Sequence, residues 1–187
     1  MIVGVDEVGR GCWAGPLVAG AVVLSEIIPG LNDSKLLSKA QRNALSDVVL
    51  ANTAAASLGW VSSHEVDSLG LTAAVRLAMR RAVEQIKVDY DEIIIDGNYN
   101  FLSDDARAKT LIRADATVPA VSAASIIAKV ARDNWMCTKA AIEFPAYGFE
   151  KHMGYGTKLH RDMLHKHGVC ALHRKSYRPI QHIMQIV

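Results

Sequence analysis

The chain has 187 residues, half of them apolar and 21% of them charged, and its formal net charge is +2. This length and balance are typical of one globular domain that buries a full hydrophobic core without disulfides or a structural metal. Its three cysteines, Cys12, Cys137 and Cys170, are too widely spaced for a disulfide framework or a zinc ribbon, which favours a reducing, cytoplasmic compartment. Since no apolar run approaches the roughly 20 residues of a membrane helix and no leader precedes the first strand-like segment, we expect neither membrane insertion nor secretion.

The charges are distributed unevenly along the chain. Residues 1–105 carry 8 Lys+Arg against 14 Asp+Glu, whereas residues 106–187 carry 13 against 5 and six of the seven histidines. A basic part beside an acidic part favours a protein that holds a polyanion on one side and a cation in an acidic site on the other. On charge alone, an ordinary mixed and solvated surface explains the same numbers equally well.

In chain order, the apolar patterns alternate between strand and helix periods. The first two strand-like segments are too close together for a crossover, so they must pair antiparallel. Ser38 followed by Gln41 predicts a capping box at the start of a helix, and Gly168 is typical of a helix end. We expect strands at 2–8, 16–24, 54–62, 91–97 and 108–115, and helices after Ser38, over 71–86, over 121–143 and over 157–168. The sum is an α/β domain.

Four carboxylates lie at or near the ends of apolar runs. They are Asp6, Glu7, Asp96 and Asp115. An unpaired charge there would cost several kcal/mol, and carboxylates that converge at one edge of a sheet repel each other unless a cation lies between them. Oxygen ligands without a Cys or His pair favour Mg²⁺ or Mn²⁺. The alternative for a single member, such as Glu7 or Asp115, is a helix cap or a pair with a nearby arginine.

The stretch Gly9-Arg10-Gly11 directly follows the first two carboxylates. In a regular strand Asp6 and Glu7 point to opposite faces, so both can reach one metal only if the chain bends, and the glycines could supply that bend. "GRGCWA" also fits a dinucleotide fingerprint, but a proline and a strand-like run follow it where a helix should begin. A glycine-exposed backbone beside an arginine instead fits a phosphate or sugar of a larger polyanion.

The segment "VSAASIIAKVARD" predicts a helix with polar residues along one face. Those residues are Ser122, Ser125, Lys129, Arg132 and Asp133. This face could track phosphates, with Lys129 as the strongest candidate, or it could be an ordinary solvated face with one or two buried serines. Lys35, in a loop, is a further phosphate-binding candidate, and surface charge is its alternative.

The histidines of the C-terminal part suggest a metal cluster at first sight. However, His160, His165, His167 and His173 contain no pair with the i,i+4 spacing of the helical zinc motif. We therefore favour phosphate contacts or packing for these residues.

Several blocks together resemble the type 2 ribonuclease H family in order and spacing, and the resemblance covers nearly the whole chain. The blocks are "DEVGRGCWAGPLVAGAVV", "LNDSKLLS", "IIIDGN", "ADATVPAVSAASIIAKVARD", "GYGTKLH" and "HRKSY". The resemblance implies a ribonuclease H-like fold, a mixed five-stranded central sheet flanked by helices, in a single domain over 1–187. It also implies that about 145–187 form a helical C-terminal portion that binds substrate.

The resemblance further implies an endonuclease that cuts RNA in RNA/DNA hybrids and 5′ to ribonucleotides embedded in duplex DNA, leaving 5′-phosphate and 3′-hydroxyl ends. By motif, Asp6, Glu7, Asp96 and Asp115 match the family's metal-binding carboxylates, which would hold two Mg²⁺ or Mn²⁺ ions during catalysis. Gly9, Arg10 and Gly11 match its turn that reads the RNA-to-DNA junction, and Tyr155 matches its ring that stacks on the deoxyribose. Lys35, Ser122, Ser125 and Lys129 are the remaining candidate substrate contacts.

Further features of the sequence distinguish the type 2 family from its sister family and from two rival functions. The sister type 3 family has a lysine at the position of Arg10, which favours type 2, and Tyr177 replaces a commoner phenylalanine. We expect a monomer, and no clamp-binding peptide is obvious after "HIMQIV". Two rivals are a nucleic-acid-binding module without chemistry and a metal nuclease of the same fold that acts on branched or mobile DNA. The carboxylates argue against the first, and the Gly-Arg-Gly turn with Tyr155 argues against the second.

Overall fold

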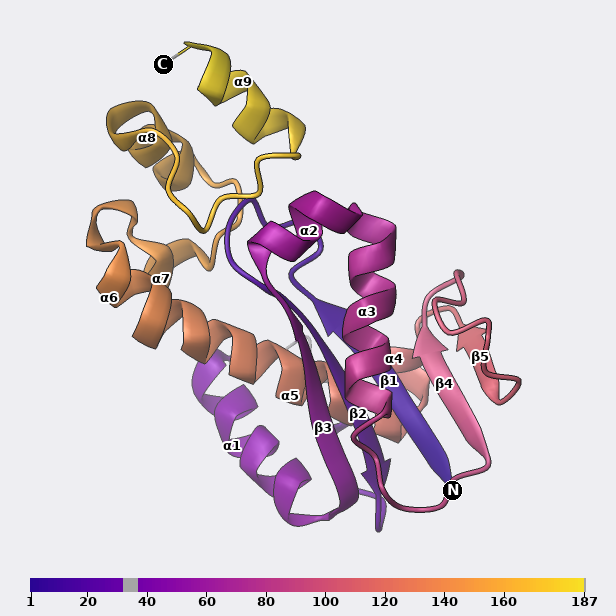
Figure 1. Ribbon diagram of the computed structural model, residues 1–187. Helices are drawn as coiled ribbons and strands as arrows, with labels where there is room; N and C mark the ends of the chain where they lie inside the picture. The colour runs from indigo at the N-terminus through magenta and orange to yellow at the C-terminus, as the bar shows by residue number, and fades with distance from the viewer. Residues whose placement is uncertain (32–36, 187) are drawn as a thin grey trace.

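The structure is a computed structural model, described for residues 1–31 and 37–186. At its centre lies a five-stranded sheet with strand order β3-β2-β1-β4-β5 (Figure 1). β1 pairs antiparallel with β2 and parallel with β4, so the sheet is mixed, as predicted. The strands are β1 (Ile2–Val8), β2 (Leu17–Leu24), β3 (Thr53–Val61), β4 (Glu92–Asp96) and β5 (Ala108–Leu111).

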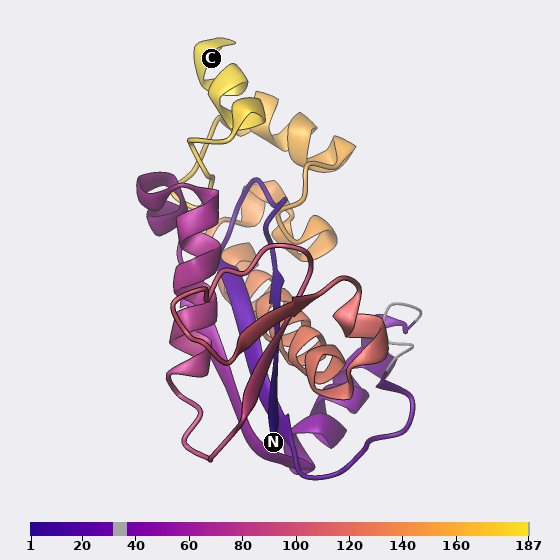
Figure 2. The same ribbon diagram turned by 90° about the vertical axis from the view of Figure 1, so that its right-hand side faces the viewer.

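Helices cover both faces of this sheet. α3 packs on one face, while α5 packs on the other with α1 beside it, as Figures 1 and 2 show. No helix in the described part of the chain is both long and apolar enough to cross a membrane. The helices are α1 (Lys39–Ala51), α2 (Ser63–Leu69), α3 (Leu71–Val83), α4 (Ala114–Thr117), α5 (Pro119–Trp135), a π-helix (Met136–Ala140), α6 (Ala141–Glu143), a 3₁₀ turn (Pro145–Tyr147), α7 (Phe149–His152), α8 (Lys158–His167) and α9 (Arg178–Ile186).

Two glycines bring α5 into direct contact with the sheet. A Cβ on Gly4 would lie 2.1 Å from the carbonyl carbon of Ala120, and one on Gly20 would lie 2.3 Å from the Ala124 oxygen. Any larger residue at these positions would push the helix away, because backbone cannot yield as a side chain can. The close approach places the polar residues of α5 within reach of the end of β1.

The alternation of β1 fixes which side chains face which helix. Val3 and Val5 belong to the core on the α3 side, whereas Gly4 contacts α5. Side chains alternate along a strand, so Asp6 points toward α5 and Glu7 toward the opposite face. The pairing with β2 is regular through Val8, so any bend that the glycines supply lies after β1 and not between the two carboxylates.

Several predicted boundaries are confirmed. Ser38 caps α1 in a capping box with Gln41, and Gly168 ends α8 by donating its N–H to the Leu164 carbonyl. The predicted long helix is α5 continued through the π-helix into α6. α2 was not predicted, although its own capping box, Ser62 with Glu65, signals it in the sequence.

The prediction that Asp115 ends a strand is wrong. β5 stops at Leu111, and Arg113 adopts the left-handed conformation with φ 59°. Extended pairing cannot continue through such a residue, so the chain turns and Asp115 lies in the first turn of α4. α4 packs against both α5 and β4, which still brings Asp115 to the same edge of the sheet.

The C-terminal helices share a second core with the loop after β1. Phe149, Leu164 and Ile180 pack in one cluster with Ala14 and Met136. In Figure 1 this part lies beyond the end of β1, above the sheet. The loop and the C-terminal segment therefore form one packed unit at this end.

Candidate active site

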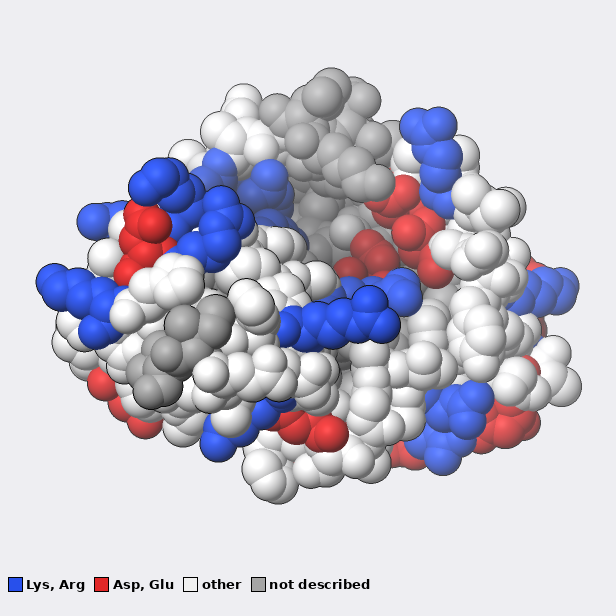
Figure 3. All heavy atoms as spheres, turned by 90° about the horizontal axis from the view of Figure 1, so that it is seen from above, with Lys and Arg blue, Asp and Glu red and all other residues white. Residues whose placement is uncertain are grey.

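The carboxylates meet where the pairing between β1 and β4 ends. The last parallel pair is Val5 with Ile95, and Asp6 and Asp96 are the next residues on the two strands. Figure 3 looks down on this end of the molecule and shows acidic side chains in a hollow, with Lys and Arg side chains gathered on the surface to one side. The parallel register thus places two acids that are distant in the sequence at the same edge.

Asp6 is nearly enclosed, with 9% of its surface exposed. Its Oδ1 accepts the N–H of Glu7 at 2.8 Å. Burial, together with the charges of Glu7 and Asp96, raises the pKa of Asp6 to about 7, although hydrogen bonds from Ser125 on α5 and from the Glu7 amide lower it. Ser125 and the Glu7 amide therefore stabilise the ionised form that burial disfavours.

Glu7 lies on the other side of the strand end. Burial raises its pKa, whereas Arg10, whose Nη1 lies 3.1 Å from Glu7 Oε1, lowers it, and Asp96 again raises it. The charge of Asp96 therefore raises the pKa of both Asp6 and Glu7, although their side chains leave β1 in opposite directions. The ion pair with Arg10 links Glu7 to the turn that follows.

Asp115 reaches the site from α4. It is 5% exposed, and its backbone N–H faces Asp96 Oδ1 at 3.4 Å. Thus β1, β4 and α4 bring together the four carboxylates that the sequence singled out.

This donor set fits a divalent cation. All four side chains offer hard carboxylate oxygens, and the charges of Glu7 and Asp96 raise the pKa of Asp6. A cation among them would remove the repulsion and favour the ionised forms. Within the described residues no three acidic, His or Cys side chains already stand as a ready set of ligands, so the carboxylates must draw closer around an ion.

The Gly9-Arg10-Gly11 turn begins directly after β1. Gly9 has φ 92°, and a Cβ there would lie 2.5 Å from Arg132 Nε, so this position requires glycine. A Cβ on Gly11 would meet no atom within 4 Å, which leaves the turn open toward solvent on that side. Arg10 is exposed and its guanidinium lies 5.7 Å from the ring centre of Phe101.

Tyr155 is the exposed aromatic residue of the neighbouring loop. It is 39% exposed, and its ring centre lies 5.6 Å from Lys129 Nζ and 6.0 Å from the Arg132 guanidinium. Burial of its hydroxyl end raises the pKa of Tyr155 to about 12. The ring is thus a neutral apolar face backed by two cations, which suits stacking on a sugar or base.

Comparison with known proteins decides the family. A family model described as ribonuclease HII matches residues 3–180. The chain belongs to the ribonuclease HII family. A curated ribonuclease HII from Delftia acidovorans is 43% identical over 188 residues, covering all of this chain and 79% of that protein. The chain is accordingly a type 2 ribonuclease H, a metal-binding nuclease and hydrolase.

Solved structures agree with the fold. The ribonuclease H2 of Pyrococcus horikoshii superposes with a TM-score of 0.80 at 24% identity, covering 99% of this chain and 97% of that one. Bst-RNase HIII, solved in complex with Mn²⁺, gives 0.76 at 18% identity, covering 99% of this chain and 69% of that one. At these identities the likeness shows the ribonuclease H-like fold, and ribonuclease H enzymes use divalent metals.

The polar face predicted for α5 in this ribonuclease HII is only partly exposed: the burial of Ser122 agrees with the alternative of one or two buried serines, whereas the burial of Arg132 and Asp133 contradicts both a phosphate-tracking and a solvated face at these two residues. Ser122 is fully buried and donates to the Leu31 carbonyl. Arg132 is also fully buried and donates to three backbone carbonyls, those of Pro16, Met153 and Ala14. Helical spacing placed these residues on one face, but the loop after β1 and the Met153 segment cover that face.

Lys129 is the part of the predicted face that faces outward. Its side chain is 28% exposed and pairs with Asp133 at 2.9 Å. Together with Ser125 beside Asp6, it remains a candidate for the site. Lys35 lies outside the described residues.

The histidine prediction is confirmed for packing. The Nε2 atoms of His160 and His173 lie 3.0 Å apart in the interior, and His152, which the sequence did not single out, stacks on His160. Burial lowers the pKa values of His160 and His173 to about 4, so both are neutral at pH 7. His165 and His167 are exposed at the end of α8.

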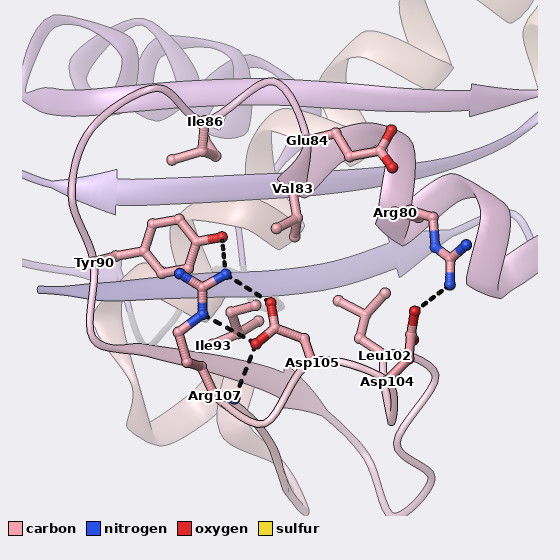
Figure 4. A pocket seen from close by; sticks show the side chains of 10 residues that line it. All are labelled: Arg80, Val83, Glu84, Ile86, Tyr90, Ile93, Leu102, Asp104, Asp105 and Arg107. Atoms are coloured by element: carbon pink, nitrogen blue, oxygen red, sulfur yellow. Dashed lines mark hydrogen bonds and ion pairs between the residues drawn. The ribbon is translucent and has the colours of Figure 1, made fainter.

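A separate pocket lies between α3 and the chain that enters β4. It has a cavity volume of about 400 Å³ and an apolar floor that includes Ile93 (Figure 4). Arg107 pairs with Asp105 and donates to the Tyr90 hydroxyl, while Arg80 pairs with Asp104. Both arginines are thus already paired with other side chains of this pocket. Tyr90 lies just before β4, at the end opposite Asp96, so the pocket is separate from the carboxylates.

Proposed function

We propose that the chain hydrolyses the RNA strand of RNA/DNA hybrids and cuts 5′ to ribonucleotides embedded in duplex DNA. The products carry 5′-phosphate and 3′-hydroxyl ends. In the cell this activity would serve ribonucleotide excision and RNA primer removal in the cytoplasm. The observation that carries the proposal is the placement of four carboxylates directly beside a glycine turn that is open toward solvent at Gly11.

Two Mg²⁺ or Mn²⁺ ions held at this site would supply activation of a water molecule and neutralisation of the charge on the phosphoryl oxygens. Asp6 and Asp96 would be direct ligands, because they follow the last parallel pair of two adjacent strands and lie on the same face. Glu7 and Asp115 complete the two sites from β1 and α4. Ser125 and the Glu7 amide favour the ionised form of Asp6, which a metal ligand requires.

Specificity must come from the 2′-hydroxyl, because this group alone separates RNA from DNA at a given position. The backbone of Gly9-Arg10-Gly11 is close to the carboxylates and can approach a ribose without a side chain in between. Tyr155 would stack on the deoxyribose beyond the junction. Lys129 lies behind that ring and would face a backbone phosphate.

The C-terminal portion, about 145–187, would hold the duplex as part of a single domain over 1–187. Its surface carries exposed basic side chains, namely Lys151, Lys158, Arg161 and Lys166. Lysine and arginine at such positions bind phosphates without reading sequence. We expect a monomer. Ser122 is not among the proposed contacts because its side chain is enclosed.

The alternatives differ in what they do with the carboxylates. A binding module without chemistry has no use for negative charge beside a phosphate, and a nuclease for branched or mobile DNA has no use for a turn that reads ribose. The carboxylates and the open glycine turn lie side by side, which favours the proposed function over both alternatives.

The test uses a labelled DNA duplex with one internal ribonucleotide, incubated with the protein and Mg²⁺ or Mn²⁺. An all-DNA duplex and the Asp6→Asn variant are the controls. Metal-dependent cutting on the 5′ side of the ribonucleotide, absent from both controls, supports the proposal. Binding without cutting in either metal favours the module, and equal cutting of the all-DNA duplex favours the other nuclease.

A further inference from the structure

The carbonyls of the Gly9-Arg10-Gly11 turn are held from below by two side chains of the C-terminal segment. Arg174 Nη1 donates to the Gly9 carbonyl at 2.7 Å and to the Arg10 carbonyl at 3.1 Å. The Tyr177 hydroxyl donates to the same Arg10 carbonyl at 2.6 Å and accepts from Arg174 Nη1 at 2.9 Å. Arg174 also donates twice to the Gly15 carbonyl.

Arg174 is fully buried, and the contacts that the structure gives it are all to uncharged oxygens. A buried guanidinium is stable only where its N–H groups are satisfied, so it fixes the positions of the carbonyls around it. The loop conformation and the arginine thus require each other. The Tyr177 ring lies 5.3 Å from the guanidinium carbon and covers it.

The turn that carries these two side chains is itself anchored to the sheet domain. Asp67 of α2 accepts the N–H groups of Lys175 and Ser176 and the Ser176 hydroxyl. In addition, the N–H of Arg174 donates to the Trp13 carbonyl at 2.8 Å. The two side chains are therefore presented from a rigid support.

Because each peptide group is planar, fixing the carbonyls of Gly9 and Arg10 also fixes the direction of the N–H groups that follow them. The carbonyl of Arg10 and the N–H of Gly11 belong to one trans peptide group and point in opposite directions. Because Arg174 and Tyr177 hold the carbonyl inward, the Gly11 N–H points outward, on the side where a Cβ on Gly11 would meet open space. The same reasoning turns the Arg10 N–H away from the held Gly9 carbonyl.

We propose that the Tyr177 hydroxyl, together with Arg174, is a positioning device that aims the backbone N–H groups of Arg10 and Gly11 at the ribose of the substrate. The inference rests on the proposed function and deepens it. Neither Tyr177 nor Arg174 touches the reacting atoms. They set how accurately the turn recognises the 2′-hydroxyl.

Tyr177→Phe tests the inference by removing one oxygen atom. Tyr90→Phe is the matched control, because Tyr90 is also half-buried, also hydrogen-bonds an arginine, Arg107, and lies at the far end of β4. On a duplex with a single ribonucleotide, we expect Tyr177→Phe to lower kcat about fivefold, the effect of one hydrogen bond, with KM changed less than about twofold. Tyr90→Phe should leave both values unchanged.

Amide NMR gives a second readout that a general loss of stability does not produce. The Arg10 and Gly11 N–H resonances should shift in Tyr177→Phe and stay in place in Tyr90→Phe. If Tyr177→Phe cuts like the wild type and these resonances do not move, the inference is wrong while the proposed function stands. If the wild-type protein cuts no ribonucleotide substrate, the proposed function fails first and the inference fails with it.

Discussion

Asp6→Asn is expected to abolish cleavage and, at the same time, to stabilise the metal-free protein. Asn has nearly the same shape as Asp, and its side-chain oxygen can still accept the N–H of Glu7. The substitution removes a charge that is buried beside Glu7 and Asp96. Burial and the charges of these two neighbours are what raise the pKa of Asp6 to about 7. A carboxylate that destabilises its own fold when ionised is what the proposed cation site predicts for Asp6.

The magnitude and its pH dependence follow from that pKa. The value rises from 3.8 to about 7, and each pKa unit corresponds to 1.36 kcal/mol, so the ionised carboxylate costs at most about 4 kcal/mol of folding free energy. Because the pKa of an acid is raised in the folded state, this cost is fully present above pH 7 and disappears as the pH falls toward 4. If the substitution recovers half of this upper bound, about 2 kcal/mol, the Tm of a domain of this size rises by roughly 4–8 °C.

Thermal unfolding followed by circular dichroism in EDTA measures the effect. We expect Asp6→Asn to melt higher than the wild type at pH 8 and at nearly the same temperature at pH 4. Asp91→Asn is the control, because an ion pair with the chain's amino group lowers the pKa of Asp91, so this exposed residue gives no gain at any pH. Added Mg²⁺ should raise the Tm of the wild type and not that of Asp6→Asn. Equal melting of wild type and Asp6→Asn at pH 8 would refute the argument that Asp6 is ionised against the repulsion of its neighbours.

The remaining predictions concern catalysis and metal binding. Asp96→Asn should lower the cleavage rate by several orders of magnitude with an unchanged circular dichroism spectrum, and near-normal turnover would contradict its role as a ligand. Calorimetry should show Mn²⁺ affinity falling about tenfold per pH unit below pH 7, because the proton on Asp6 competes with the metal. Ser125→Ala should move this fall to higher pH, because the hydrogen bond from the Ser125 hydroxyl lowers the pKa of Asp6. Tyr155→Ala should reduce cutting at a single ribonucleotide more than it weakens binding of an RNA/DNA hybrid, and an equal loss on both would exclude stacking at the junction.

The parts of the fold that could be predicted from the sequence are those with local causes. The capping box of Ser38 and Gln41 fixes the start of α1, and Gly168 fixes the end of α8. Short apolar runs that end in an acid locate Asp6 and Asp96 correctly on β1 and β4. In each case neighbouring residues determine the backbone, so the pattern is visible within a few positions.

The parts that could not be predicted depend on contacts between distant segments. Asp115 follows an apolar run that is typical of a strand, but the left-handed Arg113 ends the strand early. Arg132 has the spacing of a surface residue, and its burial comes from carbonyls near residues 14–16, more than a hundred positions away. Every residue has a backbone carbonyl, so no particular residue type in the sequence marks the carbonyls to which a buried arginine will donate.

Two halves of the site thus follow opposite physical rules. On one side of the Gly9-Arg10-Gly11 turn, buried carboxylates repel each other, so under the proposed function this half would be completed only by cations. On the other side, the buried guanidiniums of Arg132 and Arg174 are already satisfied by backbone carbonyls, so this half is rigid before any substrate binds. Under the proposed function, rejection of DNA would depend on this order. A turn that could adapt would hydrogen-bond water or phosphate in place of a missing 2′-hydroxyl, whereas a turn whose carbonyls are fixed leaves its N–H groups unsatisfied against deoxyribose and loses binding energy there. Discrimination should therefore fall as the grip of Arg174 and Tyr177 on the turn is loosened, even where the carboxylates stay intact.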